Sequence, residues 1–263
     1  MKSIRRRLRR DGLRLLVEEL VGRVLCWLVF FPGRCSWSNL RNLAYYHQLN
    51  CSYCLLKKSG NSNIMKILHL QITGDRTDDP AIYRRQYRFH NSHESLWSLG
   101  KKLVRIKRSS KFTFVRDPYL RCLSMFRDKV ERGNNEKYRA VPGFGQMGKE
   151  GFREFCRFLY EGGTAFDDHF QSQINSLPLP LSDFDFVGKL ENFSEDFLKV
   201  LKLANIQPSK QVLELVNNRA NTAHVTYSEK YLSQYYDDEI EAMVRCVYRD
   251  DFSELSYPDF ESE

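Results

Sequence analysis

The amino-acid sequence predicts a single α/β domain with a central parallel sheet flanked by helices. Two stretches indicate this class, at residues 52–68 and 112–130. Each reads as a short buried strand that runs through a turn into a helix. The third observation is size, because 263 residues with 42% hydrophobic content can bury a full core. Neither an internal repeat nor a low-complexity linker divides the chain.

The first 34 residues predict a separate element, a basic amphipathic helix, so that residues 35–263 form the domain. Residues 1–14 hold seven Lys and Arg against one acid, and an apolar stripe with helical spacing follows. The uninterrupted apolar run, residues 24–31, is far shorter than the ~20 residues of a membrane span. Residues 1–31 can therefore contact an anionic membrane surface or pack on the domain, and both alternatives stay open.

The first strand-turn-helix stretch has the composition of a phosphate-binding loop. A strand at 52–56 runs into KKSGNS, and a helix begins near Asn63. Gly60 permits a tight turn, Ser62 offers a hydroxyl and a helix cap, and Lys58 supplies positive charge. The pattern G-x-x-x-x-G-K-[ST] is absent, which argues against a kinase. An ordinary Gly-Asn turn is the competing interpretation.

The second stretch predicts another anion site. A strand at 112–115 ends at Arg116, and Asp117 followed by Pro118 is typical of a helix start. A helix N-terminus favours negatively charged ligands, and an arginine beside it can form paired hydrogen bonds with a phosphate. The alternative is a basic turn that binds nothing.

The helix after this turn has one apolar face. The face is formed by Tyr119, Leu123, Phe126 and Val130. Arg121, Ser124 and Asp128 are expected to point elsewhere.

Charge and cysteine content limit the ligand classes. Residues 100–132 carry a net charge of +8, which favours a polyanionic ligand and keeps nucleic acid as the generic alternative. The seven cysteines lack the spacing of a disulfide framework and predict mostly reduced thiols. Cys51 and Cys54 lie in a predicted strand and therefore on opposite faces, where they cannot share a metal ion.

Together the two stretches resemble the nucleotide-binding signatures of the carbohydrate sulfotransferase family, which includes chondroitin and dermatan 4-O-sulfotransferases. The matching segments are KSGNSNIMK at 58–66, FVRDPYLRCLSMF at 114–126, DDHFQSQ at 167–173, FVGKLEN at 186–192 and YRDDF at 248–252, with Tyr257 after them. The resemblance covers about residues 53–257. Departures from the family pattern are Lys57 in place of proline, Asn61-Ser62 in place of a Cys or Thr pair, Phe170 in place of tryptophan, and Ser172 in place of proline.

The resemblance implies a P-loop-like sulfotransferase fold and transfer of a sulfuryl group from 3′-phosphoadenosine 5′-phosphosulfate to a carbohydrate hydroxyl. It places the 5′-phosphosulfate at Lys58, Ser59, Gly60, Asn61, Ser62 and Asn63, and the 3′-phosphate at Arg116 and Ser124. Lys58 would also neutralise the charge that develops on the leaving phosphate, so it has a catalytic role as well. No metal ion is expected.

A base must remove the proton of the acceptor hydroxyl, and the resemblance favours His169. An imidazole, with a reference pKa of ~6.5, suits this role. His90 and His93 are the alternatives. Lys189 and Glu191 either line the site or form a loop ion pair.

Two other function classes remain open. One is a basic protein that binds a membrane surface or nucleic acid, of which nucleic acid is the less favoured partner. The other is a nucleotide-dependent kinase-like enzyme. The absence of a convincing anchor predicts a bacterial-type cytoplasmic enzyme, peripheral at the membrane. The alternative, implied by animal members of the family, is the Golgi membrane.

The remaining elements are expected to be helical at 151–160, 193–203, 212–216 and 228–249, with a strand at 184–188 and a polar connection at 32–50. Residues 140–149 form a Gly-rich loop that can border an acceptor cleft.

Overall fold

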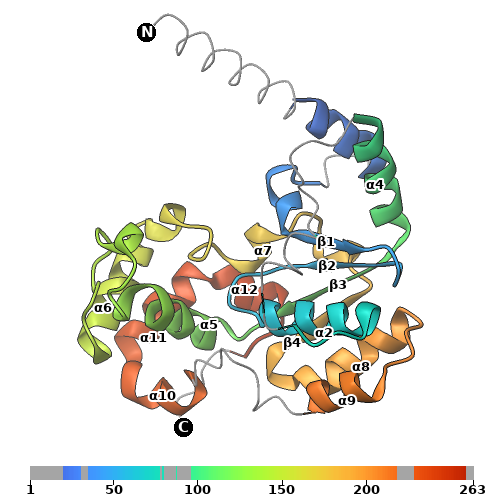
Figure 1. Ribbon diagram of the computed structural model, residues 1–263. Coiled ribbons are helices and arrows are strands. Elements are labelled where there is room, and N and C mark those ends of the chain that lie inside the picture. The colour runs from blue at the N-terminus through green and yellow to red at the C-terminus, as the bar shows by residue number, and fades with distance from the viewer. Residues whose placement is uncertain are drawn as a thin grey trace, which may run out of the picture.

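A four-stranded sheet lies at the centre of the computed structural model, which describes residues 20–30, 35–77, 79, 87, 96–217 and 228–258 (Figure 1). The strands are β1 (Leu43–Tyr46), β2 (Cys51–Cys54), β3 (Ser110–Val115) and β4 (Phe186–Lys189), and they lie side by side in that order. β2, β3 and β4 are parallel, which confirms the predicted sheet, whereas β1 runs antiparallel to β2. β1 lies in the segment predicted as a polar connection.

The helices of the described residues flank this sheet. They are α2 (Asn61–Thr73), α4 (Leu96–Arg108), α5 (Pro118–Met125), α6 (Gly148–Tyr160), α7 (Gln173–Ser176), α8 (Phe193–Leu203), α9 (Lys210–Asn217), α10 (Ser228–Tyr235), α11 (Asp238–Val247) and α12 (Arg249–Glu254). α5 continues directly into a π-helical segment, Phe126–Glu131.

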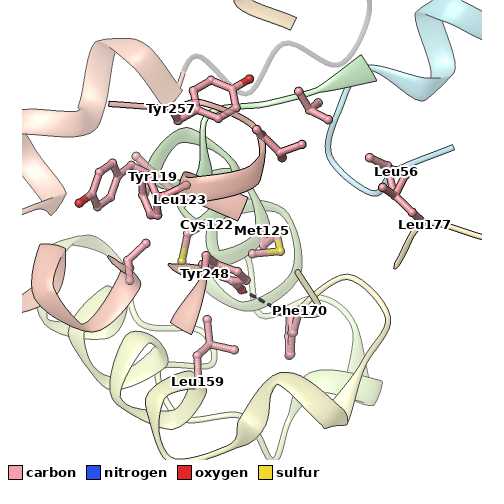
Figure 2. Close-up of a cluster of buried hydrophobic side chains, with 14 of the residues drawn as sticks. Leu56, Tyr119, Cys122, Leu123, Met125, Leu159, Phe170, Leu177, Tyr248 and Tyr257 are labelled. Carbon is pink, nitrogen blue, oxygen red and sulfur yellow. Dashed lines mark hydrogen bonds between the residues drawn. The ribbon is translucent and has the colours of Figure 1, made fainter. Parts of the chain in front are cut away.

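Two hydrophobic clusters cover the two faces of the sheet. On one face α2, α8 and α9 pack on Tyr53, Phe112 and Phe114. The other cluster joins α5, α6 and α11 and includes the aromatic side chains around Tyr248 (Figure 2). Cys51 belongs to the first cluster and Cys54 to the second, so the predicted opposite orientation of these two thiols is confirmed.

Residues 20–30 form a helix that packs on the domain beside α4 (Figure 1). Cys26 and Phe30 lie in the core, and the Lys107 ammonium donates a hydrogen bond to the Val29 carbonyl over 2.6 Å. Among the described helices, none has both the length and the apolar character required to cross a bilayer. Residues 1–19 and 31–34 lie outside the described residues, so the helix over residues 1–34 and its boundary with the domain stay predictions.

Most predicted helices are present, and one is divided. α8 has the predicted bounds, and α6 and α9 begin two or three residues earlier than expected. The single helix predicted over 228–249 is wrong, because this stretch forms α10, α11 and the beginning of α12. Asp237 explains the break, since its carboxylate accepts a hydrogen bond from the Ile240 amide over 3.1 Å and caps a new helix.

Candidate active site

The predicted phosphate loop lies between β2 and α2 and adopts a conformation that few residue types tolerate. Lys58 and Gly60 both have positive φ, +68° and +79°. A Cβ atom at Gly60 would lie 2.7 Å from a terminal methyl of Leu190, and the positive φ itself disfavours any side chain there. Gly60 also occupies the N-cap position of α2, where it offers no capping side chain. The first turn of α2 therefore has no side-chain cap and suits an anion.

The polar side chains of this loop hold its shape. The Ser59 hydroxyl donates to the Gln173 side chain over 3.2 Å. The Asn61 amide group accepts from the Tyr53 hydroxyl over 2.6 Å and donates to the Leu56 carbonyl over 2.8 Å. Ser59 and Asn61 therefore contribute backbone conformation, whereas Ser62 and Asn63 present half-buried side chains on the first turn of α2.

Lys58 lies in this loop beside a carboxylate of the π-helical segment. Its ammonium is 3.1 Å from the Asp128 carboxylate. Burial lowers the pKa of Lys58 to about 8, although the Asp128 charge acts in the opposite direction. Burial also favours a neutral Asp128, but Lys58 and Lys129 outweigh it and hold the pKa of Asp128 at about 2. The pair is therefore ionised at neutral pH.

Arg116 lies at the end of β3 and is buried. The side-chain amide of Gln173 holds its backbone, accepting from the Arg116 amide and donating to the Arg116 carbonyl, both over 2.8 Å. The positive charge of Arg116 contributes to the lowered pKa of Lys58, so the two cations belong to one electrostatic site.

The start of α5 confirms the predicted cap. Asp117 accepts a hydrogen bond from the Leu120 amide over 2.9 Å, and Pro118 is the first helical residue. The Asp117 carboxylate therefore occupies this helix N-terminus, directly after Arg116 in the chain. Ser124 lies further along α5 and is only 1% exposed, as is Arg121, so the expectation that they point away from the core is wrong.

His169 forms a close pair with Asp167. Its Nδ1 atom lies 2.5 Å from the Asp167 carboxylate, which also accepts from the His169 amide and from the Lys137 ammonium. Burial, together with the positive charges of Lys57 and Lys129, lowers the pKa of His169 to about 4, although Asp167 opposes this.

The protonation of this pair follows from its environment. Burial acts to raise the pKa of Asp167, but hydrogen bonds from Lys137 and His169 outweigh it and lower the pKa to about 2. An ionised carboxylate can only accept hydrogen bonds, so the neutral ring carries its proton on Nδ1 and Nε2 can accept another. The alternatives for the base, His90 and His93, lie outside the described residues.

Lys189 and Glu191 contact Ser256 and Tyr257. The Lys189 ammonium donates to the Ser256 carbonyl over 2.8 Å and lies 4.2 Å from the centre of the Tyr257 ring. The Glu191 carboxylate accepts from the Tyr257 hydroxyl over 3.0 Å and from the Asp117 amide over 2.9 Å. These contacts indicate support for the turn that carries Arg116.

Three residues that the sequence did not assign to the site connect its parts: Arg121, Gln173 and Asp251. Gln173 contacts both Ser59 and Arg116, and the Asp251 carboxylate accepts from the Gln173 amide over 2.8 Å. Gln173 and Asp251 lie in segments that carry the family resemblance, which was the available signal. Arg121 joins the loop of Lys58 to the segment of His169.

The fold and these contacts define a class, an α/β protein with a basic turn and a helix after each of two neighbouring parallel strands. Comparison with known families then identifies it. The sulfotransferase family matches residues 42–258, so the chain belongs to that family. The predicted recognition and fold class are thereby confirmed.

The related proteins are carbohydrate sulfotransferases. Mouse carbohydrate sulfotransferase 12 is 35% identical over 194 residues, 59% of this chain and 46% of that protein. Human carbohydrate sulfotransferase 9 is 30% identical over 167 residues, 55% of this chain and 36% of that protein. Rat carbohydrate sulfotransferase 11 is 24% identical over 243 residues, 84% and 68% of the two chains. The chain thus spans less than half the length of the first two, and no solved structure matches it significantly.

The relatives bear on the predicted localisation, on the alternative functions and on the sulfuryl donor. The predicted localisation, that of a bacterial-type cytoplasmic enzyme, is wrong, because the relatives are vertebrate carbohydrate sulfotransferases. The nucleic-acid-binding and kinase-like alternatives gain no support from the family. The family implies 3′-phosphoadenosine 5′-phosphosulfate as sulfuryl donor. Contact of residues 1–31 with a membrane surface and the absence of a metal ion stay predictions.

Proposed function

We propose that this chain transfers a sulfuryl group from 3′-phosphoadenosine 5′-phosphosulfate to a hydroxyl of a carbohydrate acceptor. The observation that carries the proposal is the network that joins the Lys58 loop, the Arg116 turn and the His169 segment through Gln173 and Arg121. It brings cations for a nucleotide and a neutral, oriented imidazole into one region of a sulfotransferase-family chain whose relatives are named as carbohydrate sulfotransferases.

The donor has two separate phosphate groups, and the chain offers a match for each. The uncapped first turn of α2 and the Lys58 ammonium suit the 5′-phosphosulfate. Arg116, with Ser124 on the following helix, suits the 3′-phosphate. Gly60, at a positive φ that favours glycine, leaves the backbone of this turn without a side chain and so open to close approach by a ligand.

In the transfer step the acceptor oxygen forms a bond to sulfur while the bond between sulfur and the 5′-phosphate oxygen breaks. Nε2 of His169 takes the acceptor proton, and Asp167 stabilises the imidazolium that results. Lys58 balances the negative charge that develops on the departing adenosine 3′,5′-bisphosphate.

Arg116→Ala tests the donor site. We expect binding of adenosine 3′,5′-bisphosphate, measured by isothermal titration calorimetry, to weaken at least about tenfold, the effect of losing a charged hydrogen-bonding partner. Removing residues 1–14 is the control and should leave binding unchanged. The opposite pattern would contradict the proposed enzyme and favour a polyanion-binding role for residues 1–14. Competition by adenosine triphosphate as strong as that of the bisphosphate would favour a kinase.

His169→Ala tests the base. Bisphosphate binding should persist, while sulfate transfer to a panel of glycans should fall about 10²-fold or more, the usual contribution of a positioned base. His47→Ala is the control, since His47 is an exposed residue of the turn between β1 and β2. Undiminished transfer by the His169 variant would exclude it and leave His90 and His93 as candidates.

A further inference from the structure

The side chain of Arg121, on α5, is buried between the Lys58 loop and the His169 segment. It is 1% exposed and ranks among the largest fully buried side chains of the described residues. Its carboxylate neighbour, Asp251, lies 3.9 Å from Nη1, and Nη1 has no hydrogen-bond partner. The ion pair with Asp251 is thus at the limit of its range, and the closer partners of the guanidinium are neutral acceptors.

The remaining donors of Arg121 bind backbone carbonyls of two segments that are distant in sequence. Nε donates to the carbonyl of Lys57, the residue before Lys58, over 3.1 Å. Nη2 donates to the carbonyl of His169 over 3.2 Å and to that of Gln171 over 2.6 Å. One rigid planar group thus contacts the phosphate loop on one side and the base-bearing segment on the other.

Two contacts hold the guanidinium in this orientation. It lies 5.6 Å from the centre of the Tyr248 ring, and the Tyr248 hydroxyl donates to the Phe170 carbonyl over 2.9 Å (Figure 2). Tyr248 therefore contacts the arginine and also the segment that the arginine binds. The guanidinium of Arg121 therefore has little freedom to rotate.

We propose that Arg121 is a positioning residue for sulfuryl transfer, whose guanidinium sets the separation between Lys58 at the donor and His169 at the acceptor hydroxyl. This inference rests on the proposed function. In-line transfer depends on that separation, because a displacement of about 1 Å in the bound reactants can cost roughly 10²-fold in rate. A lysine at this position retains the charge but lacks the fork that reaches both segments.

Donor binding has its own supports, which remain when Arg121 is changed. Gln173 holds Ser59 and the Arg116 backbone, and Asp251 holds the amides of Gln173 and Ile174 over 2.8 and 2.9 Å. Substitution of Arg121 should therefore alter turnover much more than binding.

Arg121→Lys is the test. We expect kcat, at saturating donor and acceptor, to fall about 10²-fold, while the dissociation constant for adenosine 3′,5′-bisphosphate changes less than about threefold. Arg153→Lys is the matched control, because Arg153 also joins two elements, binding Asp237 over 2.7 Å between α6 and α11, but lies outside the site. It should lower thermal stability without lowering kcat.

A second variant guards against loss of folding. Arg121→Gln combined with Asp251→Asn removes both buried charges together, which is less disruptive than leaving one unpaired. It should melt cooperatively and show at least the same loss of kcat, since it also removes one of the two acceptors that hold the Gln173 and Ile174 amides. In a His169→Ala background, Arg121→Lys should add less than about threefold, because its effect passes through His169.

The outcomes separate the two proposals. A wild-type protein that neither binds the bisphosphate nor transfers sulfate overturns the proposed function and this inference with it. An active wild type whose Arg121→Lys variant keeps kcat within about threefold overturns the positioning role alone, as does an equal loss of binding and turnover. A full Arg121→Lys effect in the His169→Ala background also overturns it.

Discussion

At the residue scale, the charge of Lys58 depends on two opposing neighbours. Burial favours the neutral amine and lowers its pKa to about 8, whereas Asp128, at 3.1 Å, favours the charged form. The folded-state pKa lies below the ordinary value of 10.5 for lysine, so Lys58 loses its charge as the pH rises through 8. A step that needs this charge should therefore weaken on the alkaline side.

Asp128→Asn should shift this dependence. Without the carboxylate the pKa of Lys58 falls further, so the alkaline limb of kcat/KM moves to lower pH. For a shift of one pKa unit, activity at pH 8 falls roughly fivefold relative to wild type. A pH–rate profile measures the shift, with Asp185→Asn, which lies on the surface beside Lys111, as control. An unchanged alkaline limb would show that Asp128 does not maintain the charge of Lys58.

Sequence motifs located Lys58 and His169 but not the groups that act on them. Asp167 is two residues from His169, yet only the fold shows that its carboxylate faces the ring at 2.5 Å. Asp128 and Arg121 were expected to point away from the apolar face of their helix. They contact Lys58 and Lys57 because a separate loop passes beside that helix, and helical periodicity carries no information about such a neighbour.

At the element scale, the strand-turn-helix units were predictable because their signals are local. Asp117 and Pro118 mark the start of α5, and β-branched and aromatic residues mark β3. β1 was missed because its pairing with β2 is not visible within its own polar segment. The break between α10 and α11 lies at Asp237, whose carboxylate caps α11 and also binds Arg153 on α6, so a contact from outside the helix adds to the local cap.

The helix at residues 20–30 allows a prediction about cysteine chemistry. The Cys26 and Cys35 sulfur atoms lie 2.8 Å apart, so oxidised glutathione should link them, with two thiols oxidised to one disulfide and the glutathione disulfide reduced to two thiols. The pKa of the Cys35 thiol is raised, chiefly by its hydrogen bond with Cys26 and secondly by burial, so the reaction should be slow at neutral pH. The link should stabilise the fold by about 2 kcal/mol.

Peptide mass mapping without reducing agent measures this link. A peptide joining Cys26 to Cys35 should appear, whereas Cys246, which is exposed, should carry a mixed disulfide with glutathione. Separate alkylation of Cys26 and Cys35 after the treatment would contradict the predicted pairing and support the mostly reduced thiols expected from the sequence.

At the scale of the whole molecule, the candidate site is assembled from segments that are far apart in sequence. Residues near positions 58, 116, 169 and 251 meet through Gln173 and Arg121. The sequence indicated these segments separately, as matches to one family. Their distances, and the buried polar contacts between them, follow from packing across the sheet and have no local signal.

Tyr257 provides a further support of this assembly, and Tyr257→Phe tests it. The Tyr257 hydroxyl donates to Glu191, whose other carboxylate oxygen accepts from the Asp117 amide next to Arg116. Removing one hydrogen bond to a charged group should lower the free energy of unfolding by about 2 kcal/mol. Urea unfolding measures this, and bisphosphate titration should show a few-fold weaker binding because the Arg116 turn loses a support. Tyr160→Phe is the control, since Tyr160 is 56% exposed on α6. Unchanged stability and binding in the Tyr257 variant would show that the turn holds Arg116 without the hydrogen bond from Tyr257 to Glu191.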